Sequence, residues 1–258
     1  MPIPTDQEKL EMIKLEPPTP AELETCPFCA GHEHMTPPQT LVLPQEGNWR
    51  VRVVPNLYPA LERQEVVVHS RRHARSIGEL EDEELELVAD AWRRRRAAVP
   101  EGYLQALVNE GREAGASLAH SHSQLAWLPA PPPIEPTLDG EVVAEEDGVV
   151  ARCPRLARLP YESAIAPAEP EEDGVRSALL GPALRLLADL VRRLHSLEGP
   201  VPLNAWLHDV DAWRIVLLPR LTVLAGLELG AAVFVNPLPP EEAAERLRNA
   251  ESARRRSP

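Results

Sequence analysis

Two long segments of the chain repeat apolar residues at helical spacing. EELELVADAWRRR begins at Glu83 and PALRLLADLVRRL begins at Pro182, and in both segments apolar residues recur three or four positions apart. That spacing places the apolar side chains on one face of an α-helix, where they can pack against a core. The pattern therefore predicts two amphipathic helices, each covering one part of the protein.

Shorter runs rich in β-branched residues predict strands. These runs are Val51 to Val53, Val66 to Val68, Arg214 to Leu218 and Ala231 to Val235. Valine and isoleucine favour extended backbone, because their branched side chains pack well on a pleated surface. We therefore expect one pair of strands before the first helix and further strands after the second.

The predicted elements recur along the chain. VRVVPNL from Val51 matches VARCPRL from Val150, an offset of about 99 residues (150 − 51), and the two helical segments align at the same offset. Each copy reads strand, strand, helix and then more strands. The pattern predicts an α+β protein built from two related units, which the proline-rich segment Leu128–Pro136 connects.

Composition excludes several classes of function. The 258 residues are enough for one large domain or two small ones, and the net charge of −13 argues against general nucleic-acid binding. No apolar run approaches the roughly 18–20 residues that span a bilayer. The segment before Lys14 lacks an apolar signal core, so we expect a cytoplasmic protein without a membrane partner.

The sequence AHSHSQ places three polar residues at alternate positions. His120, His122 and Gln124 would share one face of a strand, with Ser121 and Ser123 on the other. One interpretation is a strand whose polar face meets water. The alternative is that one histidine binds a metal ion while its neighbour reacts with a substrate.

The segment CPFC, Cys26–Cys29, is a candidate for metal binding or redox chemistry. A structural zinc site needs four ligands, and this segment supplies two. His73 and His120 are the best candidates to complete the set, while His32 and His34 are rivals. Redox chemistry is less favoured, because no thioredoxin-like βαβ pattern surrounds the two cysteines.

Five segments, taken together, resemble the galactose-1-phosphate uridylyltransferase family of the histidine-triad superfamily, in the branch that includes plant ADP-glucose phosphorylase. They run in order over most of the chain. The segments are CPFCAGHEHMTPP (26–38), WRVRVVPNLYPAL (49–61), EVVVHSRRHARSIGEL (65–80), NEGREAGASLAHSHSQ (109–124) and AGLELGAAVFVNPLPPEEAAERLR (225–248).

The resemblance implies two tandem histidine-triad-like repeats, each a mainly antiparallel sheet with a packed helix. The first repeat would span residues 1–135 and carry the metal site and the HxHxQ motif. The second would span residues 136–258 and contribute the sugar side of the pocket. Val216 and Leu218 stand in place of histidines there, so we expect no metal ion and no nucleophile in the second repeat.

The resemblance also implies a role for each matching residue. His122 corresponds to the nucleophile, and Gln124 to the glutamine that hydrogen-bonds the nucleotidyl phosphate. The implied ligands of a structural zinc ion are Cys26, Cys29, His73 and His120. The implied substrate-binding residues are Asn56, Leu57 and Tyr58 for base and ribose, Asn109, Gly115 and Ser117 for phosphates and ribose, and Glu228 and Asn236 for the hexose.

The activity implied is a hexose-1-phosphate uridylyltransferase of galactose metabolism, which exchanges UDP-glucose and galactose 1-phosphate through a nucleotidyl-histidine. One alternative is a phosphorylase of ADP-glucose or of dinucleoside polyphosphates. Another is a catalytically weakened, zinc-stapled nucleotide-binding protein. That reading is favoured by the absence of arginine before Arg50, because family members carry arginines near the first cysteine that reach the nucleotide in a homodimer. The expected partners are a nucleotide sugar and a sugar 1-phosphate, with a homodimer as an option.

Overall fold

The computed structural model describes residues 19–133 and 139–250, and these residues build one ten-stranded sheet. Its strand order is β1-β2-β3-β5-β4-β9-β10-β8-β7-β6, and every neighbouring pair is antiparallel. The strands are β1 (Leu41–Leu43), β2 (Val51–Pro55), β3 (Gln64–Val68), β4 (Tyr103–Glu110), β5 (His122–Leu128), β6 (Gly140–Glu146), β7 (Val149–Pro154), β8 (Ser163–Pro167), β9 (Leu203–His208) and β10 (Arg214–Pro219).

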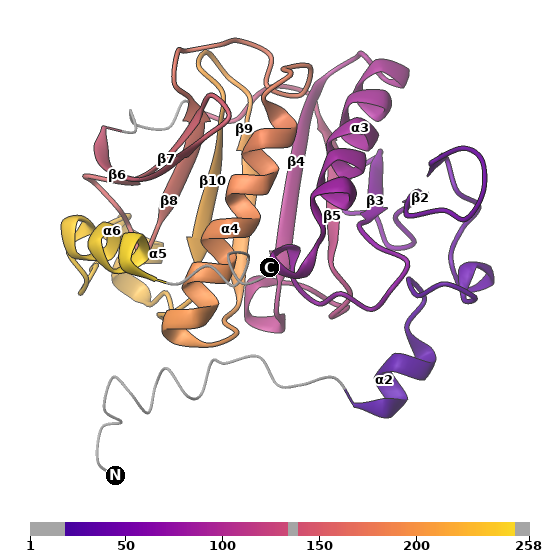
Figure 1. Ribbon diagram of the computed structural model, residues 1–258, viewed down its shortest axis with the longest axis horizontal. Coiled ribbons are helices and arrows are strands. Elements are labelled where there is room, and N and C mark those ends of the chain that lie inside the picture. The colour runs from indigo at the N-terminus through magenta and orange to yellow at the C-terminus, as the bar shows by residue number, and fades with distance from the viewer. Residues whose placement is uncertain (1–18, 134–138, 251–258) are drawn as a thin grey trace, which may run out of the picture.

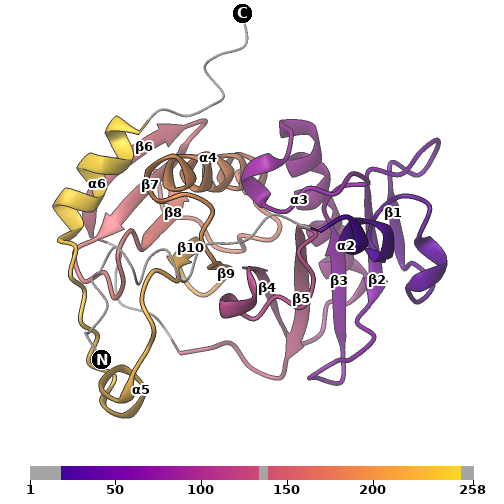
Figure 2. The same cartoon turned by 90° about the horizontal axis from the view of Figure 1, so that it is seen from below.

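The longer helices cover one face of this sheet. The helices are α2 (Pro20–Thr25), α3 (Asp82–Ala98), α4 (Leu180–Glu198), α5 (Gly226–Ala231) and α6 (Pro240–Asn249), with 3-10 turns η1 (Glu33–Met35), η2 (Ile77–Glu79) and η3 (Arg112–Ala114). Figure 1 shows α3 and α4 side by side across the sheet, and Figure 2 shows both on one side of it, with α5 on the other.

The hydrophobic core lies between the helices and the sheet. Leu85 and Trp92 of α3 and Leu184 of α4 are completely or almost completely buried in it, together with the inward side chains of the strands. Burying apolar surface of this kind is the main favourable term in folding. Among the described residues, no long helix covers the opposite face of the sheet over β4, β5 and β9 (Figure 2). We call this the open face, and side chains that point to it are available to a ligand.

The strand order is symmetric about the centre of the sheet. The order β2-β3-β5-β4 on one side is repeated as β7-β8-β10-β9 on the other, and β4 pairs with β9 between them. The predicted α+β class, with mainly antiparallel strands and packed helices, is confirmed. The predicted division between residues 135 and 136 lies outside the described residues and stays a prediction.

Most of the elements predicted from the sequence are present. Both helices and three of the four predicted strands are confirmed as α3, α4, β2, β3 and β10. The strand predicted at Ala231–Val235 is wrong: Ala231 ends α5 and Ala232 has a left-handed backbone with φ 53°. Val233 and Val235 are 51% and 59% exposed there. An apolar run forms a strand only beside a neighbour that accepts its hydrogen bonds, and none of the described strands pairs with this segment.

Crossing a bilayer requires a long apolar helix, and none of the helices within residues 19–133 and 139–250 meets that requirement.

Candidate active site and metal centre

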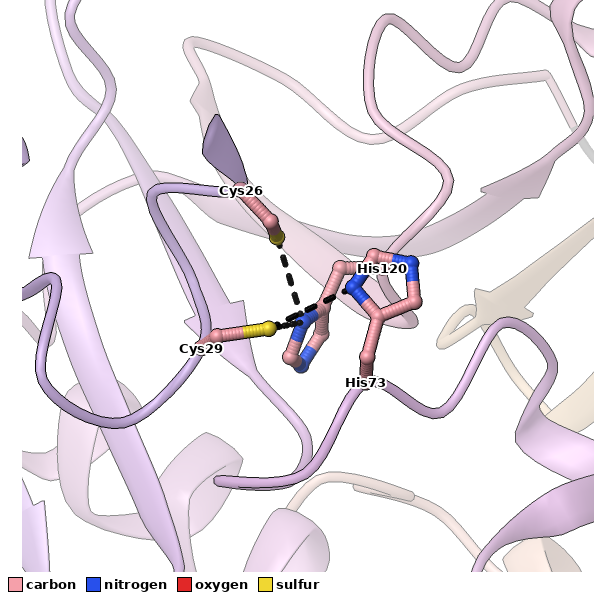
Figure 3. Close-up of side chains that lie close together, drawn as sticks. All are labelled: Cys26, Cys29, His73 and His120. Atoms are coloured by element: carbon pink, nitrogen blue, oxygen red, sulfur yellow. Dashed lines mark hydrogen bonds between the residues drawn. The ribbon is translucent and has the colours of Figure 1, made fainter. Parts of the chain in front are cut away.

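Four side chains from three separate segments point toward one another beside the open face of the sheet. Cys26 and Cys29 lie in the loop after α2, His73 lies in the loop after β3, and His120 lies just before β5 (Figure 3). The Sγ of Cys26 is 3.5 Å from Nδ1 of His120. The Sγ of Cys29 is 3.3 Å from Nδ1 of His73 and 3.6 Å from Nδ1 of His120.

These distances fit a tetrahedral metal site. With usual zinc–sulfur and zinc–nitrogen bond lengths, sulfur and nitrogen ligands of one zinc ion are separated by about 3.6 Å. The four ligand atoms all lie within 4.8 Å of one another, and the cluster could hold a metal ion. His32 and His34 are not members: Nδ1 of His32 lies 2.7 Å from the carbonyl of Cys26, and its ring contacts that of His34.

The protonation states of the histidine and cysteine side chains also suit the binding of a metal cation. The Nε2–H of His120 donates to the carbonyl of Ser70 at 2.9 Å, which leaves Nδ1 unprotonated and aimed at the thiols. Burial lowers the pKa of His120 to about 4, so its ring is neutral at pH 7. Burial and the nearby Cys26 raise the pKa of the Cys29 thiol to about 12. A dication reverses that last effect, since a coordinated thiol is deprotonated.

Strand β5 begins at His122, two residues later than the alternating pattern indicated. His120 and Ser121 therefore lie in the approach to the strand, and His122 is its first residue. The side chain of Ser123 accepts a hydrogen bond from Nε1 of Trp92 in α3, so Ser123 faces the helices. Alternation along the strand then places His122 and Gln124 on the open face.

The ring of His122 is held in one tautomer. Its Nδ1–H donates to the carbonyl of His120 at 2.7 Å, and the ring of Phe28 packs edge-on against it with centroids 5.4 Å apart. The lone pair of the His122 imidazole therefore lies on Nε2. Burial lowers the pKa of His122, which keeps this nitrogen unprotonated at neutral pH. His120, a member of the Cys26, Cys29, His73 and His120 cluster, thus orients the ring of His122 through its backbone carbonyl.

His122 and Gln124 line a cavity of about 350 Å³ on the open face. Leu57 and Tyr58, which also line it, are 60% and 86% exposed. Such exposed apolar side chains beside a polar floor suit an aromatic ring such as a nucleotide base. The full lining is Pro27, Phe28, Met35, Thr36, Pro37, Val54, Pro55, Asn56, Leu57, Tyr58, Val66, Ser117, Leu118, His122 and Gln124.

Asn109 and Gly115 lie together at the end of β4. Gly115 has φ +90°, and a Cβ there would lie 3.8 Å from the side-chain nitrogen of Asn109. The side-chain oxygen of Asn109 accepts from Nδ2 of Asn204 in β9 at 2.8 Å. Arg220 donates in turn to Asn204 at 3.2 Å. Asn204 and Arg220 were not singled out in the sequence, because only the β4–β9 pairing brings them to this site.

A second, shallower depression of about 390 Å³ adjoins the first across β4. Leu107 of β4 lies opposite both Gln124 and Trp206 in the sheet, so it separates the two hollows by one strand. The lining consists of Gln105, Leu107, Asn109, Asn204, Ala205, Trp206 and Leu218. Gln124 therefore lies one strand away from this surface.

The two hexose candidates of the second half lie outside both linings. The exposed carboxylate of Glu228 accepts from the backbone N–H of Ala225 at 2.9 Å, within its own short helix α5. Asn236 donates to the carbonyl of Ala157 and accepts from the N–H of Leu238, both at 3.1 Å. The structure therefore does not bring them to His122, and their contact with a sugar stays a prediction.

Comparison with known proteins points to one enzyme family. A sequence profile described as the N-terminal domain of galactose-1-phosphate uridyl transferase matches residues 59–129, the segment that includes β3, α3, β4 and β5. The ADP-glucose phosphorylase of Arabidopsis thaliana is 27% identical over 288 residues, covering 87% of this chain and 81% of that protein. The galactose-1-phosphate uridylyltransferase of Thermotoga maritima is 25% identical, covering 91% of this chain and 92% of the relative.

A solved structure shares the fold. The crystal structure of an ADP-glucose phosphorylase from Arabidopsis thaliana with bound ADP-glucose superposes with a TM-score of 0.79 at 23% identity, covering 92% of this chain and 93% of that one. This structure supports the fold, and the sequence profile and the two relatives confirm the resemblance to the galactose-1-phosphate uridylyltransferase family inferred from the sequence.

Proposed function

We propose that this protein is an enzyme that transfers a nucleotidyl group from a nucleotide sugar to a second phosphate, through a covalent nucleotidyl-histidine on His122. The observation that carries the proposal is the position of His122. It lines the 350 Å³ cavity, and its Nδ1–H is committed to the carbonyl of His120. A neutral imidazole with a free Nε2 is a competent nucleophile near pH 7.

In the first step, Nε2 of His122 attacks the α-phosphorus of the bound nucleotide sugar. A P–N bond forms, the P–O bond to the sugar 1-phosphate breaks, and its electrons leave with that oxygen. The ring becomes positively charged, and the carbonyl of His120 stabilises it through the Nδ1–H. In the second step, an oxygen of the acceptor phosphate attacks the same phosphorus, and the imidazole leaves as the neutral ring.

Gln124 has the position to stabilise the transferred phosphoryl group. It lies two residues after His122 on the same face of β5 and lines the same cavity. Its side-chain NH₂ would donate to an equatorial oxygen, where negative charge is concentrated in the transition state. We expect Asn109, Gly115 and Ser117 to hold the remaining phosphate and ribose oxygens.

We propose zinc as the ion of the Cys26, Cys29, His73 and His120 cluster, because two thiolates and two imidazoles form a usual tetrahedral zinc set. A closed set of four protein ligands leaves no position for substrate, so the ion would be structural. It would join the loop after α2, the loop after β3 and the start of β5. The backbone of His120, which orients His122, would then be held in place.

Two acceptors define two candidate reactions. Exchange of UDP-glucose with galactose 1-phosphate is supported by the matching family profile and by the Thermotoga relative. Phosphorolysis of ADP-glucose, with inorganic phosphate as acceptor, is supported by the Arabidopsis relative. Both reactions use the same His122 intermediate, so the geometry of the first step is common to them.

The test is to incubate the protein with UDP-glucose or ADP-glucose labelled in the α-phosphate and to look for label on the protein. We expect an acid-labile, base-stable linkage and exchange with the matching sugar 1-phosphate in the absence of any other acceptor. His122→Ala should abolish labelling and exchange while keeping the bound metal and the melting temperature. Discharge by galactose 1-phosphate or by inorganic phosphate then identifies the acceptor.

Near-normal turnover by His122→Ala would refute covalent catalysis. Binding of nucleotide sugars by the wild-type protein without labelling or exchange would instead indicate a binding protein that has lost its catalytic activity.

A further inference from the structure

We infer that Gln64 is a positioning residue for the transfer reaction: it fixes the side-chain amide of Gln124 so that its NH₂ group faces the phosphate. The inference rests on the proposed function. Gln64 is the first residue of β3, next to β5 in the sheet. It does not line the cavity that holds His122 and Gln124, so it acts through Gln124 and not on the substrate.

The orientation of both amides follows from one backbone group. The N–H of Ala60 can only donate, and its partner at 2.9 Å is the side chain of Gln64, which must therefore present its oxygen. The Nε2 of Gln64 is then directed to the other side, where it lies 2.5 Å from the side chain of Gln124. Because an NH₂ group has no acceptor capacity, Gln124 must present its oxygen to Gln64.

This chain of hydrogen bonds leaves one end of Gln124 for the ligand. With its oxygen committed to Gln64, the side-chain NH₂ of Gln124 is the group that remains for a partner in the cavity. An oxygen in that place would repel the phosphate, whereas an NH₂ group donates to it. A preorganised donor is the arrangement that stabilises developing negative charge in a transition state.

Backbone hydrogen bonds and strand pairing fix the position of Gln64 beside Gln124. Its carbonyl accepts from the N–H of Asn56 at 2.9 Å, which closes the loop between β2 and β3. In the β3–β5 ladder, Gln64 lies opposite Ala126 and Val66 lies opposite Gln124. Gln64 and Gln124 are therefore diagonal neighbours on one face of an antiparallel pair, within reach of long side chains.

The same hydrogen bonds, from Ala60 to Gln64 and from Gln64 to Gln124, connect the side-chain amide of Gln124 to the loop that contains Leu57 and Tyr58, which is predicted to bind the base. Ala60 lies in that loop, two residues after Tyr58, and the N–H of Tyr58 donates to the side chain of Asn56 at 3.0 Å. Leu57 and Tyr58 line the cavity. A base packed on Leu57 and Tyr58 would fix the loop in place. The N–H of Ala60, which determines which end of the Gln64 amide faces Gln124, would then be fixed as well. Correct seating of the nucleotide thus favours the catalytic orientation of Gln124.

Two substitutions separate positioning from a purely structural role. Gln64→Glu keeps the size of the side chain and the acceptor for Ala60, but it offers Gln124 a second oxygen, so the amide of Gln124 turns and its oxygen faces the phosphate. Gln64→Leu removes both hydrogen bonds and leaves Gln124 free to sample either orientation. A structural role predicts the larger defect for Gln64→Leu, and positioning predicts the larger defect for Gln64→Glu.

The measurement is the single-turnover rate at which label from the α-labelled nucleotide sugar reaches the protein. We expect Gln64→Glu to slow labelling by roughly 100-fold, the usual effect of losing one preorganised donor. We expect Gln64→Leu to slow it by less than roughly tenfold, because half of the orientations of Gln124 stay competent. Gln39→Glu, at an exposed glutamine, is the matched charge control and should leave the rate unchanged.

The pH profile gives a second readout. The introduced carboxyl has a pKa of ordinarily about 4.3, so the fraction that carries a proton, which it can donate to Gln124, grows as the pH falls toward that value. The rate of Gln64→Glu relative to wild type should therefore rise as the pH falls from 7.5 to 5.0, while the Gln64→Leu ratio stays constant.

Equal labelling rates for wild type and Gln64→Glu, or a larger defect in Gln64→Leu, would overturn the inference. Failure of the proposed function is a different result, because the wild-type protein itself would then acquire no label.

Discussion

Removal of one thiol from the Cys26, Cys29, His73 and His120 cluster tests the metal centre. Cys29→Ala deletes the sulfur that lies 3.3 Å from Nδ1 of His73 and 3.6 Å from Nδ1 of His120. His73 and His120 come 44 and 91 residues after Cys29, so a shared ion would close two long loops. We expect the variant to lose its metal ion and part of its thermal stability.

The size of the effect follows from complete loss of the ion. Structural zinc contributes about 10–16 kcal/mol to folding in zinc-finger peptides, and a variant without zinc loses the whole of that contribution. For a protein of this size each kcal/mol changes the melting temperature by about 2–4 °C, so the melting temperature should fall by at least about 20 °C. Lost packing adds little, because Cys29 is only partly buried and a thiol has little more apolar surface than a methyl group.

The assay combines metal analysis of the purified protein with thermal unfolding in the presence and absence of a chelator. Wild type should contain about one zinc ion per chain and should melt at a lower temperature after chelation. Cys29→Ala should contain none, and a chelator should leave its melting temperature unchanged. Cys153→Ala is the control for removal of a thiol, because this buried thiol lies in β7 within the hydrophobic core, 3.8 Å from the Ser163 hydroxyl, and is not a member of the cluster.

Stoichiometric zinc in Cys29→Ala would refute the assignment of the ligands. Wild-type protein that loses its metal ion without any change in melting temperature would refute the structural role of the ion.

Two further predictions concern stability. Arg95 holds the buried Glu65 through two hydrogen bonds of 2.7 and 2.8 Å, so Glu65→Gln should cost roughly 3 kcal/mol in denaturant unfolding. The exposed pair Arg94–Asp90 is the control, and Asp90→Asn should cost less than about 0.5 kcal/mol; equal costs would contradict the reasoning. Burial, with a smaller effect of Arg75, lowers the pKa of His195 to about 4. Because the unfolded chain then binds the extra proton, stability should fall as the pH drops from about 6.5 toward 4, and His195→Gln should reduce this slope by up to about 1.4 kcal/mol per pH unit. A slope unchanged by His195→Gln would show that His195 titrates alike in both states.

Local pattern was sufficient for the two longest helices and for three of the ten described strands. The helical spacing of α3 and α4 and the β-branched runs of β2, β3 and β10 are confirmed, because each depends on residues that are neighbours in sequence. The run at Ala231–Val235 shows the limit of that reasoning. Its residues are suited to a strand, but extended backbone is stabilised by a neighbouring strand, and no local pattern reports whether one is there.

The sequence by itself determined which residue types could carry the chemistry: two cysteines three positions apart, and the alternation of His120, His122 and Gln124. Only the tertiary structure decided the partners. The cysteines meet His73 instead of His32, although His32 is much closer in sequence, because the loop after β3 returns to the start of β5. The pairing of β3 with β5 brings Gln64 to Gln124. Such contacts depend on strand register and loop path, which are set by the burial of the whole sheet.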